Sequence, residues 1–345
     1  MLQRRSFRHL TAAAFALGAL GISQAASANP VEEFYRNKNI NLMVGFAPGG
    51  GADLWGRFLA RHLGSFVPGK PNVVVQNMPG ASGFRAVGYT FNVAPMDGTN
   101  LVLPVPTALT APSLGVANVT WDVFKFQWIG NLNRDSVGCV AMGKSGIKSI
   151  ADAKNRQIIF GADGMDDPAA QQPRALANLL GFNIKVIAGF KGTGHALLSL
   201  ESGEIDARCA FFASQALSER RADLDSGKLV PIMQVGSRKH AIFGNAPLVY
   251  DFARTEDERK IMQFIFGSTE ITRPVAVGPG VPKDRVDALR EAFWTAANSK
   301  QLRDDAARLN LVVDPMDWKE TESAIRASID FDPSIIDRAK KMIAY

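Results

Sequence analysis

The chain has 345 residues, of which 46% are hydrophobic and 21% are charged, and its formal net charge at pH 7 is +6. This length allows two domains with cores of their own, and the composition is typical of a soluble globular protein. No block of lysine and arginine is interleaved with aromatic residues, so we do not expect nucleic acid as a partner.

The first 28 residues are typical of a cleaved export signal. Arg4, Arg5 and Arg8 form a basic start, residues 10–22 are apolar but too few to span a bilayer, and Ala-Ser-Ala at 26–28 is a small-residue cleavage site. The paired arginines also resemble a twin-arginine signal, which leaves the export route open. Three of the 39 basic residues and none of the 33 acidic ones lie in this segment, so the remaining chain carries a net charge of about +3.

A strand, a glycine-rich turn and a helix are predicted at residues 40–63. Residues 40–44 form an apolar run that suits a buried strand, and residues 54–63 place apolar side chains one helical turn apart. Pro-Gly-Gly-Gly lies between them at 48–51. Glycines allow positive φ and a helix start offers unpaired N–H groups, so the turn predicts a site for a carboxylate. A tight structural connection is the alternative, and the spacing fits neither a dinucleotide fingerprint nor a P-loop.

The chain up to residue 107 continues this alternation. Strands are predicted at 72–77 and 100–105, with a helix at 84–92 between them. Such an alternation favours a doubly wound parallel sheet, in which ligands bind beyond the carboxyl ends of the strands. The turns at 48–51 and 79–83 and the loop at 104–107 all follow strands, so we expect them to meet at that edge.

A second α/β unit of similar design is predicted after residue 126. Its expected strands are 137–142, 157–161, 184–187 and 204–209, with helices that begin after Ser149 and cover 196–201. Asp167 before Pro168 predicts a helix N-cap, whereas Pro173 argues against one continuous helix there.

The C-terminal part predicts helices near 256–266, 284–297 and 318–327 and a strand at 271–277, and we expect this end to pack onto the first unit. The predicted limits are 1–28 for the signal, 29–131 and 248–345 for the first lobe, and 132–247 for the second lobe.

Two enzyme classes, a nucleotide hydrolase and a secreted hydrolase, are not supported by the sequence. Residues 138–145 match the P-loop expression G-x-x-x-x-G-K-S, but their middle residues read as an apolar strand rather than a phosphate-wrapping loop. A secreted hydrolase is disfavoured because no G-x-S-x-G occurs and the histidines after residue 28 lack metal-ligand spacing. We therefore expect no catalysis, cofactor or metal. Cys139 and Cys209 either pair in an oxidising compartment or stay as buried free thiols.

An ordered set of motifs covers nearly the whole chain after residue 28. The set comprises the turn at 48–53, Asn77-x-Pro-Gly-Ala-x-Gly, Asp97-Gly98-Thr99, Phe190-Lys191-Gly192, Gly203-Glu204-Ile205-Asp206 and Pro279-Gly280-Val281-Pro282. It resembles the Bug family, the periplasmic receptors of tripartite tricarboxylate transporters. The resemblance implies a two-lobed α/β periplasmic binding protein of type II kind, which captures a small organic acid in a cleft between the lobes and delivers it to a membrane permease. We expect a monomer; the rival function is a ligand sensor for a membrane kinase.

The resemblance also implies which residues contact the ligand, because in that family the first glycine turn holds a carboxylate and loops of the second lobe hold the other end. From this carry-over and from the strand ends, the expected contacts are Ala47, Gly49, Gly50, Gly51, Ala52, Asp53, Pro106, Thr107, Phe160, Gly161, Gly164, Asp167, Lys191, Gly192, Thr193, Asp206 and Arg208. Ala52 departs from the family, which usually has Thr there.

The acidic loop that carries Asp163, Asp166 and Asp167 bears on the ligand's far end. Three carboxylates disfavour a second anionic group unless a cation intervenes, and Arg208 is the candidate cation. An ion-paired or solvated Arg208 is the alternative. We therefore hypothesise an organic acid whose other end is a hydroxyl, a neutral group or a group paired with Arg208.

Overall fold

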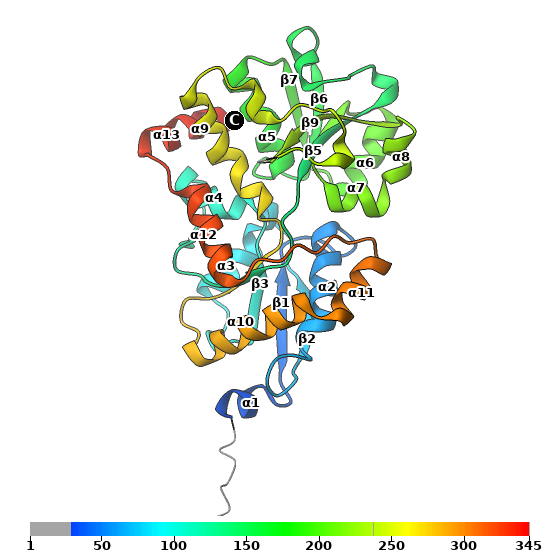
Figure 1. The fold of residues 1–345 in the computed structure, drawn as a ribbon. Coiled ribbons are helices and arrows are strands. Elements are labelled where there is room, and N and C mark those ends of the chain that lie inside the picture. Colours follow the sequence, from blue (N-terminus) through cyan, green and yellow to red (C-terminus); the bar gives the residue numbers. More distant parts are fainter. Residues whose placement is uncertain (1–28, 237, 345) are drawn as a thin grey trace, which may run out of the picture.

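The computed structural model describes residues 29–236 and 238–344, so the predicted export signal lies outside the described residues. Figure 1 shows two lobes stacked one above the other, and in the described part of the chain the strands form two five-stranded sheets, one in each lobe. The predicted two-lobed α/β fold is confirmed. None of the helices described has the length and apolar character needed to cross a membrane.

The first sheet has the strand order β2-β1-β3-β10-β4. Its central strand β1 runs parallel to β2 and β3, as predicted, whereas β10 runs antiparallel to β3 and β4. The antiparallel strand is the one that the chain adds after it has returned from the other lobe. The strands are β1 (Asn39–Val44), β2 (Asn72–Asn77), β3 (Asn100–Leu103), β4 (Gln127–Asn131) and β10 (Pro274–Val277).

Helix α2 follows β1 directly and packs on the same sheet. Its buried face places Phe58 and Leu59 in one core cluster with Leu42 of β1. Gly56 allows this close approach, because a Cβ there would lie 2.8 Å from a methyl carbon of Val44. The helices of this part of the chain are α1 (Pro30–Tyr35), α2 (Gly51–Leu63), α3 (Phe84–Asn92), α4 (Thr107–Leu114), α10 (Lys283–Asn298), α11 (Lys300–Arg308) and α12 (Trp318–Ile329).

The second sheet has the strand order β7-β6-β8-β5-β9, in which β6 runs parallel to β7 and β8 and β5 runs antiparallel to β8 and β9. Its strands are β5 (Val137–Met142), β6 (Ile158–Ala162), β7 (Ile184–Ala188), β8 (Ala207–Phe212) and β9 (Leu229–Val235). The associated helices are α5 (Pro168–Leu180), α6 (Thr193–Ser202), α7 (Ala213–Glu219), α8 (Arg221–Asp225), α9 (Glu256–Phe266) and α13 (Pro333–Ile343).

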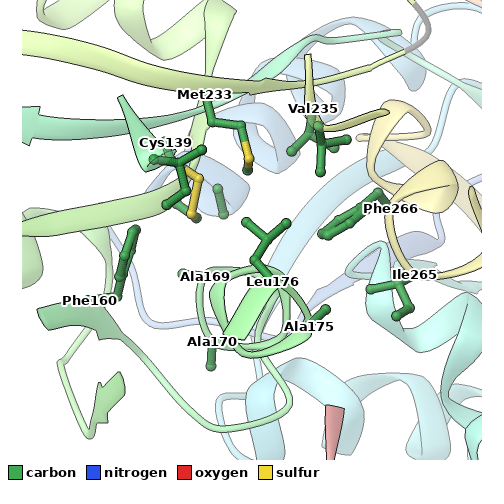
Figure 2. Close-up of a cluster of buried hydrophobic side chains, with 14 of the residues drawn as sticks. Cys139, Phe160, Ala169, Ala170, Ala175, Leu176, Met233, Val235, Ile265 and Phe266 are labelled. Carbon is green, nitrogen blue, oxygen red and sulfur yellow. A yellow bond between two sulfur atoms is a disulfide. The ribbon is translucent and has the colours of Figure 1, made fainter. Parts of the chain in front are cut away.

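The core of the second lobe gathers β5, β6, β9, α5 and α9. Figure 2 shows this cluster, with Leu176 of α5 and Phe266 of α9 among its buried side chains. Helices α9 and α13 pack against α5, so the chain returns to the first sheet through the segment between α9 and β10. The expectation that the C-terminal part packs onto the first unit is therefore wrong for α9 and α13, which belong to the core of the second lobe. The other predicted lobe limits stay a prediction.

Two local predictions in this lobe are wrong. The strand predicted at 204–209 begins at Ala207 instead, because the Asp206 backbone N–H and carboxylate are both bonded to the backbone of Ile159. Helix α5 continues through Pro173, although the ring removes one backbone donor, because the helix is buried against the sheet along its first three turns. The apparent P-loop contains β5, as predicted.

Cys139 of β5 and Cys209 of β8 form a disulfide bond, which decides between the two alternatives left open by the sequence. The strands are antiparallel neighbours, and both residues are fully buried in the core cluster. The bond closes a chain segment of 70 residues, so it restricts the unfolded chain strongly.

Replacing both cysteines, as Cys139→Ala with Cys209→Ala, removes this restriction. We expect the free energy of unfolding to fall by about 4 kcal/mol on loop length alone. Guanidinium unfolding measures this, and reduction of the wild type provides the matched comparison. Equal stability of oxidised wild type and double variant would contradict the assigned role of the bond.

Candidate functional site

A cavity of about 590 Å³ lies between the lobes. Its wall consists of segments that follow the carboxyl ends of β1, β2 and β3 in one lobe and of β6, β7 and β8 in the other. Residues of β8 itself, Leu311, and Thr272 and Arg273 of the chain that crosses between the lobes also line the cavity. The predicted meeting of the two glycine turns and the loop after β3 at one sheet edge is therefore confirmed.

The first glycine turn is held in shape by Asp53. The Asp53 carboxylate accepts hydrogen bonds from the Gly49 N–H, the Arg57 Nε and the Asn77 amide, each at 2.9 Å. Burial alone would raise the pKa of Asp53, but these hydrogen bonds outweigh it and hold the pKa below its ordinary value. Gly49 has φ +87°, a left-handed conformation that suits glycine. Asp53 thus faces the turn and is absent from the cavity wall.

The start of α2 offers hydrogen-bond donors at this turn. Gly50 is the N-cap residue and has no side chain that could satisfy the first N–H groups of the helix. In the described part of the chain, the N–H groups of Gly51 and Ala52 have no acceptor, and both residues line the cavity. Together with the helix dipole, these donors favour an anion.

Arg273 places a buried positive charge beside the same turn. Its side chain is only 5% exposed, and a Cβ added to Gly51 would lie 3.9 Å from the Arg273 Nη2. The guanidinium carbon lies 4.9 Å from the centre of the Phe212 ring and 5.6 Å from that of Trp55. Its Nη1 donates to the Thr272 carbonyl at 2.7 Å, whereas its Nε has no partner.

No carboxylate in the described residues lies within ion-pair distance of Arg273. Burial lowers the pKa of Arg273 to about 10, and the more distant Asp135 acts in the opposite direction. The group therefore stays charged at neutral pH. An unpaired buried cation beside unpaired N–H groups is suited to bind an anionic ligand group.

Arg208, in contrast, is already paired. It is 2% exposed and donates to Asp163 Oδ1 at 3.1 Å, and to the Gly161 carbonyl and Thr193 Oγ1 at 3.3 Å. The alternative left open by the sequence, an ion-paired arginine, is therefore confirmed.

Asp167 lies close to this pair and caps α5, as predicted, by accepting the Ala169 N–H at 2.8 Å. Its side chain is 6% exposed. Burial and the neighbouring Asp163 carboxylate raise the pKa of Asp167 to about 7, and Arg208 offsets only part of this effect.

The structure brings eleven of the predicted contact residues together in the cavity wall. They are Ala47, Gly49, Gly50, Gly51, Ala52, Pro106, Asp167, Lys191, Gly192, Thr193 and Arg208. The other six lie outside the wall: Asp53, Thr107, Phe160, Gly161, Gly164 and Asp206. Their assignment as ligand contacts, like that of the wall residues, stays a prediction.

Three of these six residues have a clear structural place. Phe160 is fully buried in the core of the second lobe, and the Asp206 carboxylate accepts the Ile159 N–H at 2.9 Å. Gly164 meets the first lobe, because a Cβ there would lie 2.5 Å from the Ser82 Oγ. The lobes are thus in contact between Ser82 and Gly164.

Sequence reasoning missed several wall residues, including Phe46, Trp55, Phe212, Ser214 and Arg273. For Arg273 one signal was available: a lone arginine immediately before the proline that opens an apolar strand. The described residues contain no group of three or more histidine, cysteine, aspartate or glutamate side chains arranged to hold a metal.

The sequence matches the family model described as tripartite tricarboxylate transporter family receptor over residues 64–304. No curated protein matches the sequence.

Solved structures similar to this chain include the periplasmic binding protein BugD, at 20% identity and a TM-score of 0.69, covering 89% of this chain and 98% of that one. An R. palustris protein solved with adipate has 16% identity and a TM-score of 0.67, covering 88% and 97%. MatC from Rhodopseudomonas palustris, solved with bound malate, has 17% identity and a TM-score of 0.63, covering 87% and 99%. At these identities the likeness shows the fold.

The raised pKa of Asp167 predicts that the stability of the protein depends on pH. The folded protein retains this proton up to a pKa of about 7, whereas the unfolded chain loses it near 3.8, so the contribution of this group to stability falls as the pH rises between these values. Asp167→Asn keeps an oxygen that can cap α5 and removes the titration. We expect its melting temperature, relative to wild type, to increase between pH 5 and pH 8 in thermal melts. A difference that does not change with pH would contradict this expectation.

Proposed function

Because the chain belongs to the tripartite tricarboxylate transporter receptor family, as its motifs predicted, we propose that it is a periplasmic solute-binding protein for a small organic acid. It binds the acid in the cavity between its lobes and delivers it to a membrane permease. The predicted export signal places it in the periplasm, where the two cysteines form their bond.

Arg273 is the observation on which this proposal depends. A carboxylate at Arg273 would supply the counter-charge that the described residues do not provide within ion-pair distance. The adjacent N–H groups of Gly51 and Ala52 would then satisfy the remaining oxygen. The malate and adipate bound by similar structures are acids of the expected kind.

Capture requires that ligand enter and leave a cavity enclosed by two lobes. The contact between Ser82 and Gly164 lies between loops of opposite lobes and would open when they separate. Closure over the ligand removes water from the carboxylate and presents a combined surface of both lobes to the permease. A strain that lacks the gene should lose uptake of the ligand that the purified protein binds.

Arg273→Gln tests the role of the buried cation. We expect the dissociation constant for a bound carboxylate to rise about 10- to 100-fold, because a hydrogen bond to a charged group contributes ~1.5–3 kcal/mol. Isothermal titration calorimetry of the wild type against a panel of organic acids identifies the acid, and the variant is then titrated with it.

Arg326→Gln is the matched control, since Arg326 is exposed, pairs with Glu322 and lies away from the cavity. Equal affinity of Arg273→Gln and Arg326→Gln would show that the carboxylate binds elsewhere. Binding of no acid by the wild type would remove the proposed function itself.

A further inference from the structure

The cavity runs along strand β8 and has two chemically different ends. Arg208, Ala210 and Phe212 all line it, although β8 carries a bulge at this point, where Ala210 has φ +55°. The four residue steps from Arg208 to Phe212 span at most roughly 13 Å. Arg208 lies at one end of this span, and Phe212, which carries the Arg273 guanidinium over its ring, lies at the other. A ligand that fills the cavity therefore extends from a free cation to a paired one.

Among the described residues, the end at Arg208 has no buried positive charge to spare. The guanidinium is matched by Asp163, and Asp167 adds a second buried carboxyl group beside this pair. Lys191 also lines the cavity, but it is exposed to solvent, which screens its charge. A second ligand carboxylate would meet two carboxyl groups and a guanidinium whose charge is already paired with Asp163, although its Nε has no hydrogen-bond partner, and this is unfavourable. A hydroxyl group, in contrast, can donate its hydrogen to a carboxylate oxygen.

The wall is largely apolar and rich in aromatic rings, of which Trp55 and Phe212 lie at the Arg273 end. Phe46, Trp55, Phe190 and Phe212 all contribute to it, from both lobes. Rings favour other rings through stacked and edge-on contacts beyond the area they bury. The volume of about 590 Å³ also lies well inside the range of about 300–1,000 Å³ that is usual for sites that bury a drug-sized molecule.

We propose that the ligand is an aromatic monocarboxylic acid whose far end carries a hydroxyl group. Its carboxylate binds at Arg273, its ring lies against the aromatic wall, and its hydroxyl group donates to Asp163 or Asp167. This assignment rests on the proposed function, because it names the acid that the same cavity takes. The proposed ligand differs from a dicarboxylate because the group that reaches Arg208 is uncharged.

Two matched ligand pairs test the proposal by calorimetry on the wild-type protein. 6-Hydroxyhexanoate and adipate both have six carbons, and the far end is a neutral primary alcohol in the first and a carboxylate in the second. 3-(4-Hydroxyphenyl)propionate and 3-phenylpropionate differ only in the hydroxyl group. We expect the hydroxy acid to bind about tenfold more tightly in each pair, and the aromatic hydroxy acid to bind most tightly of the four.

The outcomes separate this proposal from the function on which it rests. Tighter or equal binding of adipate overturns the neutral far end, and tighter or equal binding of 3-phenylpropionate overturns the hydroxyl contact; in both cases an organic-acid receptor remains. If 6-hydroxyhexanoate binds more tightly than the aromatic hydroxy acid, the proposed aromatic ring in the ligand is overturned. If none of the four acids, nor any other organic acid, binds, both proposals fail.

A variant localises the effect to the far end. At pH 8, above the pKa of about 7 of Asp167, Asp167→Asn is expected to narrow the preference for 6-hydroxyhexanoate over adipate severalfold. Asp304→Asn is the control, because Asp304 is exposed and pairs with Lys300 away from the cavity. If the preference narrows equally in both variants, or in neither, the assigned role of Asp167 is overturned. If Asp167→Asn does not fold, the comparison of the ligand pairs on the wild-type protein still tests the proposed ligand.

Discussion

The arrangement of the site depends on one buried charge. Moving a guanidinium group out of water is costly unless other groups compensate it. Around Arg273 the compensation is partial and comes from three parts of the molecule: the Thr272 carbonyl on the crossing chain, Trp55 of the first lobe and Phe212 of the second. An anion at this point improves the compensation of the charge and is surrounded by both lobes. Ligand binding and lobe contact are therefore favoured by the same interaction.

The two buried aspartates at helix starts show that environment, rather than residue type, sets their charge. Asp53 and Asp167 each lie near the start of a helix that follows a strand. Asp53 accepts three hydrogen bonds and has a lowered pKa, so it stays ionised and holds the glycine turn. Asp167 accepts one backbone hydrogen bond and lies near Asp163, so its pKa rises. The first residue is part of the scaffold and the second faces the cavity.

Features with a local cause could be predicted from the sequence. Strands β2 and β5 and helix α3 have the predicted bounds, because an apolar run between turn residues specifies each of them. The glycine turn at 48–51 was predicted for the same reason. The start of β8 was not, because it depends on bonds between Asp206 and Ile159, which are 47 residues apart.

The candidate site was only partly predictable for a related reason. Arg273, Trp55 and Phe212 are distant in the sequence, and no spacing pattern links them. Similarly, the sequence offered Arg208 as a free cation or an ion-paired one, and only the fold brings Asp163 to it.

The position of Arg273 would let one cation serve both lobes in the proposed closing motion. Its backbone N–H donates to the Asn131 side chain at 2.9 Å, and Thr272 donates to the Asn133 carbonyl at 2.7 Å. These bonds join the two chain segments that pass between the lobes, at residues 131–133 and 272–273, and do not join one lobe to the other. The crossing therefore fixes the backbone from which Arg273 extends, independently of the distance between the lobes. In the proposed closing motion, the glycine turn and Phe212 approach a charge that is already in place, so its ordering cost is met largely before the ligand arrives.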